Sequence, residues 1–546
     1  MRAYRNAGAP WDTDELIRAE LFGIERLEAH AASLAAAQPV ALRTASRHSL
    51  GARLRDNESI LLSAYRAIAA SVGDGRLITP AAEWLLDNYH VVEEQIREIR
   101  EDLPPSFYRL LPKLASGPLR GYPRVFGLAW AFIAHTDSRF DPEALRRFVR
   151  TYQQVQPLSI GELWAIAITL RIVLIENLRR AATRIISNRD ARAEADSMAD
   201  RLLGLDGAAG DPDALSRLEP NGADFLPAFI VQLVQRLRDQ DPRVTPAVQW
   251  LERRLSAQGL SPEQLVHDEY QKQGASNVTV RNIITSMRLL SDLDWPVFFE
   301  SVSLVDERLR AGSDFAAMAF ASRNLYRSAI EELARGSRHS ELEIAEAALA
   351  ASQLPASADT GAAAGDDRRA ADPGFHLVAA GRPAFEASLG YRRSFLVRSR
   401  HFNVPRGARR YIAAIAVLGA LVLCAALIGL RARAVNGWSL GLMAVLGFLP
   451  ALDIAIALVN RAVTRGVGAS ILPALALRQG VPEPLRTLIA VPILLSSRAA
   501  IETQVERLEV HFLSSPGTFC CIADACGARA RNCGWAGSAS AASCMN

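Results

Sequence analysis

The sequence predicts a mainly α-helical protein anchored in a membrane, and three observations support this fold class. Apolar residues recur at helical spacing through residues 10–351. Two long apolar runs, residues 411–430 and 438–459, contain only one charged residue between them. A short apolar run with β-branched residues precedes an amphipathic segment within residues 485–516. We therefore expect a helical domain, a transmembrane hairpin of two helices, and the first β-α unit of an incomplete α/β domain.

Helix starts within residues 10–351 are marked by a capping residue that is followed by proline. Proline suits the first helical position because its missing N–H has no partner there in any case. Ser159 with Glu162, and Ser261 with Gln264, also have the spacing of a capping box. We therefore predict an all-α domain of packed antiparallel helices. The capped starts are Thr79-Pro80, Asp141-Pro142, Thr245-Pro246 and Ser261-Pro262.

The segment after Ser159 has a wide apolar stripe at helical spacing, which is typical of a helix packed on a core. Charged residues lie off this stripe, at Glu162, Arg171, Arg179 and Arg180. The apolar positions of the stripe are Leu163, Ile166, Ala167, Leu170, Val173, Leu174 and Leu178.

The two apolar runs have the length that a membrane span requires. At about 1.5 Å per residue, a helix of ~20 residues matches the roughly 30 Å hydrocarbon core of a bilayer. Residues 431–437 leave room only for a tight turn between the runs. The runs therefore predict transmembrane helices at 411–430 and 438–459, with the lipid bilayer as a partner. A hairpin buried in a soluble core is the alternative, and the arginines at both flanks argue against it.

Arginine placement predicts the orientation of the hairpin. The turn has two arginines, whereas both flanks of the hairpin have more, and positive charge near span ends stays cytoplasmic. Both flanks, including the helical domain, are therefore predicted to be cytoplasmic, and residues 1–21 show no apolar core of a signal peptide. The flanking arginines are Arg392, Arg393, Arg398, Arg400, Arg406, Arg409 and Arg410 before the first span, and Arg461, Arg465 and Arg478 after the second.

Asp453 is the candidate intramembrane functional residue, because a carboxylate within a span is costly and usually faces protein, water or a partner. The alternative is that the span begins earlier and that Asp453 lies near the cytoplasmic interface. Both interpretations remain open from the sequence.

Residues 352–374 are rich in Ala, Asp, Gly and Pro and are predicted to be a flexible linker. Residues 375–410 mix aromatic residues with arginines and form a basic juxtamembrane segment. This segment suits a position at the membrane surface, and an ordinary basic stretch before a span explains it equally well.

Composition and motif searches exclude several classes of function. With 62 basic and 58 acidic residues, the charge is too balanced to indicate nucleic-acid binding. The sequence has no phosphate-binding loop, no dinucleotide-binding turn and no metalloprotease helix, and its cysteines lack the paired spacing of zinc sites. Residues 135–139 gather titratable groups, but their position between two predicted helices favours a hydrogen-bonded turn. No catalytic, cofactor-binding or metal-binding residue is predicted.

The last part of the chain changes character twice. Residues 487–495 have the length of one buried strand, and residues 497–513 form an amphipathic helix, so 485–516 read as the beginning of an α/β domain. Residues 517–546 hold five of the six cysteines and show no periodicity. We interpret this tail as a disordered, aberrant end, of the kind that a frameshift or truncation after Pro516 produces.

Several stretches together resemble the amino-terminal part of bacterial cyclic β-1,2-glucan synthases, and the resemblance extends from about residue 10 to Pro516. These proteins are several times longer than this chain. The stretches are residues 84–96, 123–140, 156–164 with 176–180, 280–288, 298–306 and 449–461.

The resemblance implies a multi-pass enzyme of the bacterial inner membrane that polymerises glucose from UDP-glucose and closes the chains into rings. It implies that residues 485–516 begin a glycosyltransferase domain, whose metal-binding and acceptor motifs lie beyond the match. No catalytic residue is therefore carried over, and the UDP-glucose donor and a divalent metal belong to the parent enzyme. The chain is predicted to be an inactive membrane-anchoring fragment that contacts other domains of the full-length synthase. The alternative is a stand-alone membrane-anchored helical scaffold or interaction module without enzymatic activity.

Overall fold

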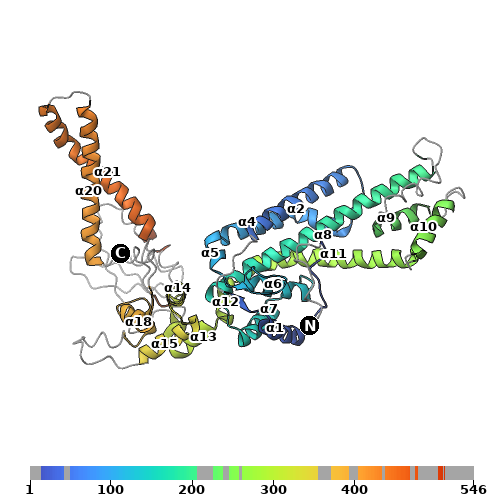
Figure 1. Cartoon of the computed structure of the whole chain (residues 1–546), viewed down its shortest axis with the longest axis horizontal. Coiled ribbons are helices and arrows are strands. Elements are labelled where there is room, and N and C mark those ends of the chain that lie inside the picture. Colours follow the sequence, from blue (N-terminus) through green and yellow to red (C-terminus); the bar gives the residue numbers. More distant parts are fainter. Residues whose placement is uncertain are drawn as a thin grey trace. The chain divides into compact units, whose positions relative to one another are not determined.

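The structure, a computed structural model of the 546-residue chain, is almost entirely helical in the residues that it describes (Figure 1). It therefore confirms the predicted mainly α fold class. Two compact units, Met1–Glu307 and Arg308–Asn546, divide the chain. The described residues are 14–41, 50–203, 205, 226–237, 245–257, 261–353, 370–392, 404–432, 437–467, 474–476, 502–503, 505–507 and 509–510.

The first unit is built around one long helix, α8 (Ile160–Leu203), whose 44 residues span about 66 Å at ~1.5 Å per residue. Figure 1 shows α8 running between α2 and α11. The other helices of this unit are α1 (Ile24–Ala37), α2 (Leu50–Gly73), α3 (Pro80–Asp87), α4 (Tyr89–Asp102), α5 (Pro105–Leu110), α6 (Arg124–His135), α7 (Pro142–Val155), α9 (Pro227–Leu237), α10 (Thr245–Ala257), α11 (Pro262–Asp292) and α12 (Trp295–Val302), and α13 (Leu304–Gly312) follows at the boundary of the units.

The predicted helix starts are confirmed at all four capped prolines. Thr79, Asp141 and Ser261 are the N-caps of α3, α7 and α11, and α10 begins at Thr245. Ser261 and Gln264 form a reciprocal capping box. The Ser159 amide donates to Glu162 Oε2 over 2.9 Å, and the Glu162 amide donates back to Ser159 Oγ over 3.3 Å. These caps satisfy amides that have no partner within their helix.

The first half of α8 is buried on every side, and not only along its apolar stripe. Glu162, Arg171, Arg179 and Arg180, which lie off that stripe, are all less than 9 % exposed. Each of them forms an ion pair, because a charged side chain is almost never fully buried unless it is paired. The helix is therefore the centre of the unit, with packed neighbours all around it.

The described strands are two residues long each and pair antiparallel. They are β1 (Val40–Ala41) and β2 (Lys113–Leu114), with Val40 opposite Leu114. This pair holds the chain after α1 against the chain before α6.

The second unit consists of small helices that pack on one another and of two long apolar helices. The small elements are the 3₁₀ helix η3 (Asp314–Ala317), α14 (Phe320–Gly336), α15 (Glu341–Gln353), α17 (Pro373–Leu377) and α18 (Arg382–Ser388). Residues 474–476 return to this unit, where Met318 and Leu475 form an isolated antiparallel bridge.

Residues 370–392 are packed on α14, which differs from the linker and juxtamembrane segment predicted for this region. Tyr326 donates to Asp372 Oδ1 over 2.6 Å, and Arg382 lies 2.6 Å from Glu332. Leu377 is fully buried and Phe385 is 6 % exposed, so apolar side chains of this segment face protein. The predicted linker 352–374 overlaps α15 and α17 at its ends, and residues 354–369 and 393–403 lie outside the described residues.

The helices α20 (Val404–Arg431) and α21 (Gly437–Val467) contain the two predicted spans and are long and apolar enough to cross a membrane. They pack against each other, and Tyr411 donates to Asn460 Oδ1 over 2.6 Å. The two helices are in contact at Gly419, where a Cβ would lie 3.8 Å from the Ala455 Cβ, an ordinary contact distance.

Most apolar side chains of this hairpin are exposed in the structure rather than buried. Ile412, Leu421, Ile428 and Leu449 are 60 % to 71 % exposed, and Trp438 is 87 % exposed. A helical hairpin in a soluble core would bury such side chains, and large exposed apolar surfaces mark interaction or membrane sites. The structure therefore indicates a membrane protein. The predicted strand at 488–495 and the tail 517–546 lie outside the described residues.

Candidate functional site

A cavity of about 1010 Å³ lies within the first unit and is lined by helices that are distant in the sequence. Its walls come from the end of α2, the start of α3, the second half of α8, from α9, and from the first half of α11. Small-molecule sites in proteins occupy roughly 300–1,000 Å³. The cavity is therefore large enough to hold a whole small molecule.

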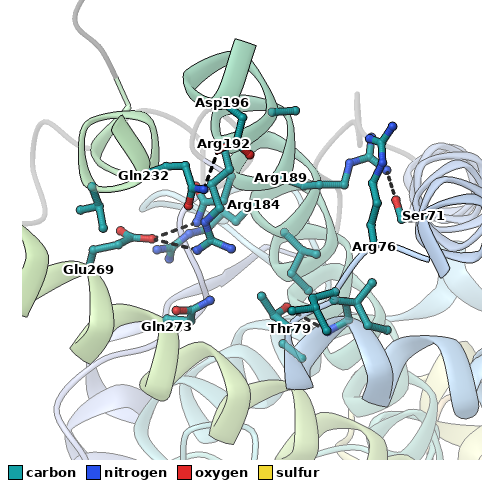
Figure 2. Close-up of a pocket in the computed structure, with 18 of the residues that line it drawn as sticks. Ser71, Arg76, Thr79, Arg184, Arg189, Arg192, Asp196, Gln232, Glu269 and Gln273 are labelled. Atoms are coloured by element: carbon teal, nitrogen blue, oxygen red, sulfur yellow. Dashed lines mark hydrogen bonds and ion pairs between the residues drawn. The ribbon is translucent and has the colours of Figure 1, made fainter. Parts of the chain in front are cut away.

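Cationic side chains dominate the charged lining of this cavity. Figure 2 shows Arg184 and Arg192 beside Glu269 and Gln273. The two arginines project from the same side of α8, because residues at i, i+4 and i+8 follow one another along a helix face. The lining cations are Arg76, Arg184, Arg189, Arg192, Arg201 and Lys272, against the carboxylates of Asp196, Asp200 and Glu269.

Two of the three lining carboxylates are paired with a cation that does not line the cavity. Arg236 on α9 places Nη2 2.5 Å from Asp200 Oδ1 and Nε 3.5 Å from Asp196 Oδ1. Glu269 is 8 % exposed, accepts a hydrogen bond from Asn188 Nδ2 over 3.3 Å, and lies 3.9 Å from Arg192. The carboxylates therefore neutralise only part of the positive charge in the cavity.

Several of the cations have no carboxylate of the cavity as a partner. Within the part of the chain that the structure describes, Arg184 and Lys272 form no ion pair. Arg189 Nη1 donates to the carbonyl of Ala67 over 2.9 Å, and its ion pair is with Asp190, a 61 % exposed side chain outside the lining. An exposed pair of this kind contributes little electrostatic energy. The cavity keeps an excess of positive charge.

Carboxamide and hydroxyl groups complete the polar lining. Gln232 Nε2 donates to Asp196 Oδ1 over 2.9 Å, and Gln235 Nε2 donates to the Tyr270 hydroxyl over 2.9 Å. Gln273 faces the same space as Arg192 in Figure 2. Among the lining residues that the structure describes there is neither His nor Cys. This arrangement suits the binding of a polar anion more than acid–base or nucleophilic chemistry.

The elements that carry the cavity residues are held together by an apolar cluster. Side chains of α8, α9, α10 and α11 share it, with Met198, Phe229 and Leu233 each no more than 2 % exposed. Burying a side chain of this size stabilises a fold by about 1.5–3 kcal/mol. The walls of the cavity are thus fixed by packing around it.

A buried ion network fixes α8 next to the part that lines the cavity. Glu176 is 1 % exposed and accepts hydrogen bonds from Arg53 Nη2 (2.8 Å), Asn57 Nδ2 (2.9 Å), Arg179 Nη2 (3.0 Å) and Arg180 Nε (2.9 Å). Burial raises the pKa of Glu176. The hydrogen bond from Arg53 and the charges of Arg53, Arg179 and Arg180 lower it by more, so that the pKa of Glu176 is about 2. The carboxylate therefore stays ionised and ties α2 to α8.

The candidate residue from the sequence, Asp453, lies on α21 and is exposed. Ala451 and Ala455, two positions before and after it, are buried. Ala455 is the residue that approaches Gly419 on α20. Since residues two apart point to different sides of a helix, Asp453 lies away from the face that contacts α20. Asp453 is the single site residue that the sequence predicted, so there is no second predicted residue with which the structure could bring it together.

The titratable residues 135–139 form a turn between α6 and α7. Asp137 and Ser138 have positive φ angles of 50° and 61°. Thr279 donates to Asp137 Oδ1 over 2.7 Å, and Ser286 donates to the Ser138 carbonyl over 2.7 Å. These bonds fasten the turn to α11, so the structural interpretation of this motif is confirmed.

The sequence analysis did not single out the arginines of the cavity. A signal was present, because Arg184, Arg189 and Arg192 fall within nine residues of one helix. The residues that face them come from α9 and α11, far away in the sequence, as in the pair of Arg192 with Glu269. Without that spatial proximity, the arginines look like an ordinary solvated face.

The fold and the two exposed apolar helices define a helical protein of the membrane. No protein-family model matches the chain. The chain is 40 % identical, over 513 residues or 92 % of its length, to the Cyclic beta-(1,2)-glucan synthase NdvB of Rhizobium meliloti (strain 1021). This match confirms the predicted resemblance to the cyclic β-1,2-glucan synthase family, and the match is partial. It spans 18 % of the length of this curated relative.

Proposed function

We propose that the chain is the amino-terminal, membrane-anchoring part of a cyclic β-1,2-glucan synthase. The observation that carries the proposal is the 40 % identity over 92 % of the chain. In this proposal the parent enzyme polymerises glucose from UDP-glucose and closes the chains into rings. The described helices of the chain supply a folded cytoplasmic part and a membrane anchor for that enzyme.

The anchor in this proposal is the hairpin of α20 and α21 in the bacterial inner membrane. Its support is the exposed apolar surface of both helices and the arginines at their outer ends, such as Arg410 and Arg461. Both flanks then lie in the cytoplasm, where a nucleotide-sugar donor is available to the rest of the enzyme.

The chain on its own is proposed not to transfer glucose. Glycosyl transfer from a nucleotide sugar requires charge stabilisation at the departing diphosphate and a correctly placed acceptor. The sequence predicts only the first β-α unit of a donor-binding domain, within residues 485–516. A single strand and helix do not form the sheet edge at which α/β domains bind nucleotides.

A chimeric enzyme tests this proposal. Residues 10–510 of the chain would replace the aligned part of a cyclic β-1,2-glucan synthase in a bacterium that lacks its own synthase. We expect the cells to contain cyclic β-1,2-glucan, and we expect none from a matched chimera that lacks residues 404–467. A chimera that is inserted in the membrane but makes no glucan would contradict the proposal and favour a stand-alone scaffold.

Asp453 is proposed to face another membrane helix of the full-length enzyme. Its support is the position of Asp453 away from the α20 contact, since an isolated carboxylate facing lipid is costly. In the chimera, Asp453→Leu is expected to lower the yield of glucan while the protein stays in the membrane. An unchanged yield would place Asp453 at the interface with water.

A further inference from the structure

We propose that the arginine-lined cavity of the first unit binds a small molecule that carries a phosphate or diphosphate group. The site consists of the lining residues of α8, α9 and α11, with Arg184 and Arg192 as the groups that hold the anion. It is separate from the proposed glucan synthesis, and its test requires no glucan product.

The charges of the cavity support an anionic ligand. Of the described residues, six cationic side chains and three carboxylates line it, and two of these carboxylates, Asp196 and Asp200, are already paired with Arg236. Like charges gathered in a cleft repel one another and raise the local concentration of anions. Arg184 is the clearest case, because it lines the cavity and forms no ion pair with any residue that the structure describes.

The type of cation supports a phosphate rather than a simple monovalent anion. Five of the six cations are arginines. A guanidinium group presents several N–H donors in a planar fork that matches the oxygen atoms of a phosphate. Arg184 and Arg192 both line the cavity, so that two such forks are available to a phosphate or diphosphate group.

The remaining lining supports a ligand with a polar body. Gln232, Gln235, Gln273 and Tyr270 offer amide and hydroxyl groups, which donate to and accept from sugar hydroxyls and heterocyclic bases. The volume of about 1010 Å³ exceeds what a single phosphate ion requires. Sugar phosphates and nucleotides share this chemistry, and the experiment separates them.

The test is a calorimetric titration of the full chain, purified in detergent, with four probes at equal ionic strength. The probes are inorganic phosphate, pyrophosphate, glucose 6-phosphate and ADP. We expect saturable 1:1 binding of at least one of them, and the probe that binds best identifies the source of the phosphate. No saturable binding of any probe would overturn the proposal.

Two double variants distinguish binding in the cavity from general electrostatic attraction to the chain. Arg184→Gln combined with Arg192→Gln is expected to weaken binding by a factor of ten or more, because two charge-assisted contacts are lost. Arg26→Gln combined with Arg97→Gln removes the same charge from side chains that are 63 % and 66 % exposed, and should leave binding unchanged. Equal weakening in both double variants would overturn the proposal.

A single variant tests whether weaker binding comes from the lost arginine rather than from disturbed folding. Arg192→Gln removes the ion pair of the nearly buried Glu269, whereas Arg184→Gln leaves no described carboxylate without a partner. Arg184→Gln alone is therefore expected to weaken binding several-fold while the melting temperature of the unliganded chain stays the same. Undiminished binding in this variant would assign the anion to another site.

Discussion

The carboxylate of Glu176 holds the buried Arg179 and Arg180 and the partly exposed Arg53 at the centre of the first unit, and its removal should destabilise this unit strongly. In Glu176→Gln the side chain keeps its shape but loses its charge. Arg179 and Arg180, with side chains that are 5 % and 3 % exposed, then lose the ionised Glu176, although Arg179 keeps its ion pair with the exposed Asp14. Removing one partner from a buried ion pair costs about 3–5 kcal/mol, since an uncompensated charge remains in the protein interior.

The pKa of Glu176 gives a second route to the same magnitude. The pKa falls from its usual 4.5 to about 2 in the folded protein. At roughly 1.4 kcal/mol per pH unit, this difference corresponds to about 3 kcal/mol. Because the folded pKa is the lower one, this contribution is fully present above pH 4.5. It is lost as the pH falls from 4.5 to about 2.

Hydrogen exchange measured by mass spectrometry on peptides of α2 and α8 tests this prediction at neutral pH. A loss of ~3 kcal/mol raises the exchange rate of the protected amides about 100-fold, since each ~1.4 kcal/mol is a factor of ten. The control is Glu94→Gln, whose ion pair with Arg97 is 51 % and 66 % exposed and should leave exchange unchanged. An increase below fivefold in Glu176→Gln would refute the account of this network.

Two further predictions concern the hairpin. A cysteine introduced at Asn436 should react with a membrane-impermeant reagent in intact cells, and one at the exposed Ala350 should react only after lysis; labelling of Ala350→Cys in intact cells would reverse the orientation. Gly419→Leu should speed hydrogen exchange in α20, because the leucine side chain would collide with Ala455. Gly429→Leu is the control and should not speed it, because the space around a Cβ at Gly429 is open. Equal effects of the two substitutions would show that the two helices do not pack through Gly419.

Local features of the fold could be predicted from the sequence, whereas its buried charges could not. The starts of α3, α7 and α11 depend on a cap and a proline that are adjacent in the chain. The pairs that bury charge on α8 join residues far apart, such as Arg53 with Glu176, 123 residues away. From the sequence alone, Arg179 and Arg180 have the pattern of a solvated helix face.

Contacts between residues that are far apart in the sequence also explain the other differences between the predicted and the observed structure. Residues 370–392 look like a linker and a basic stretch in the sequence, yet Asp372 accepts a hydrogen bond from Tyr326, 46 residues before it. The cavity was not predicted, because Arg184 and Arg192 line a cavity only when α9 and α11 pack opposite them, and this packing is not visible in the sequence. The apolar hairpin, by contrast, is visible in the sequence because its apolar residues are contiguous.

The central claim, that this chain anchors a glucan synthase without itself transferring glucose, is tested most directly by an incorporation assay. Membranes that contain only the 546-residue chain, from a host without its own synthase, are incubated with labelled UDP-glucose. We predict no labelled glucan above the level of membranes without the chain, while membranes with the chimeric enzyme make labelled cyclic β-1,2-glucan. Labelled glucan made by the chain alone would contradict the claim.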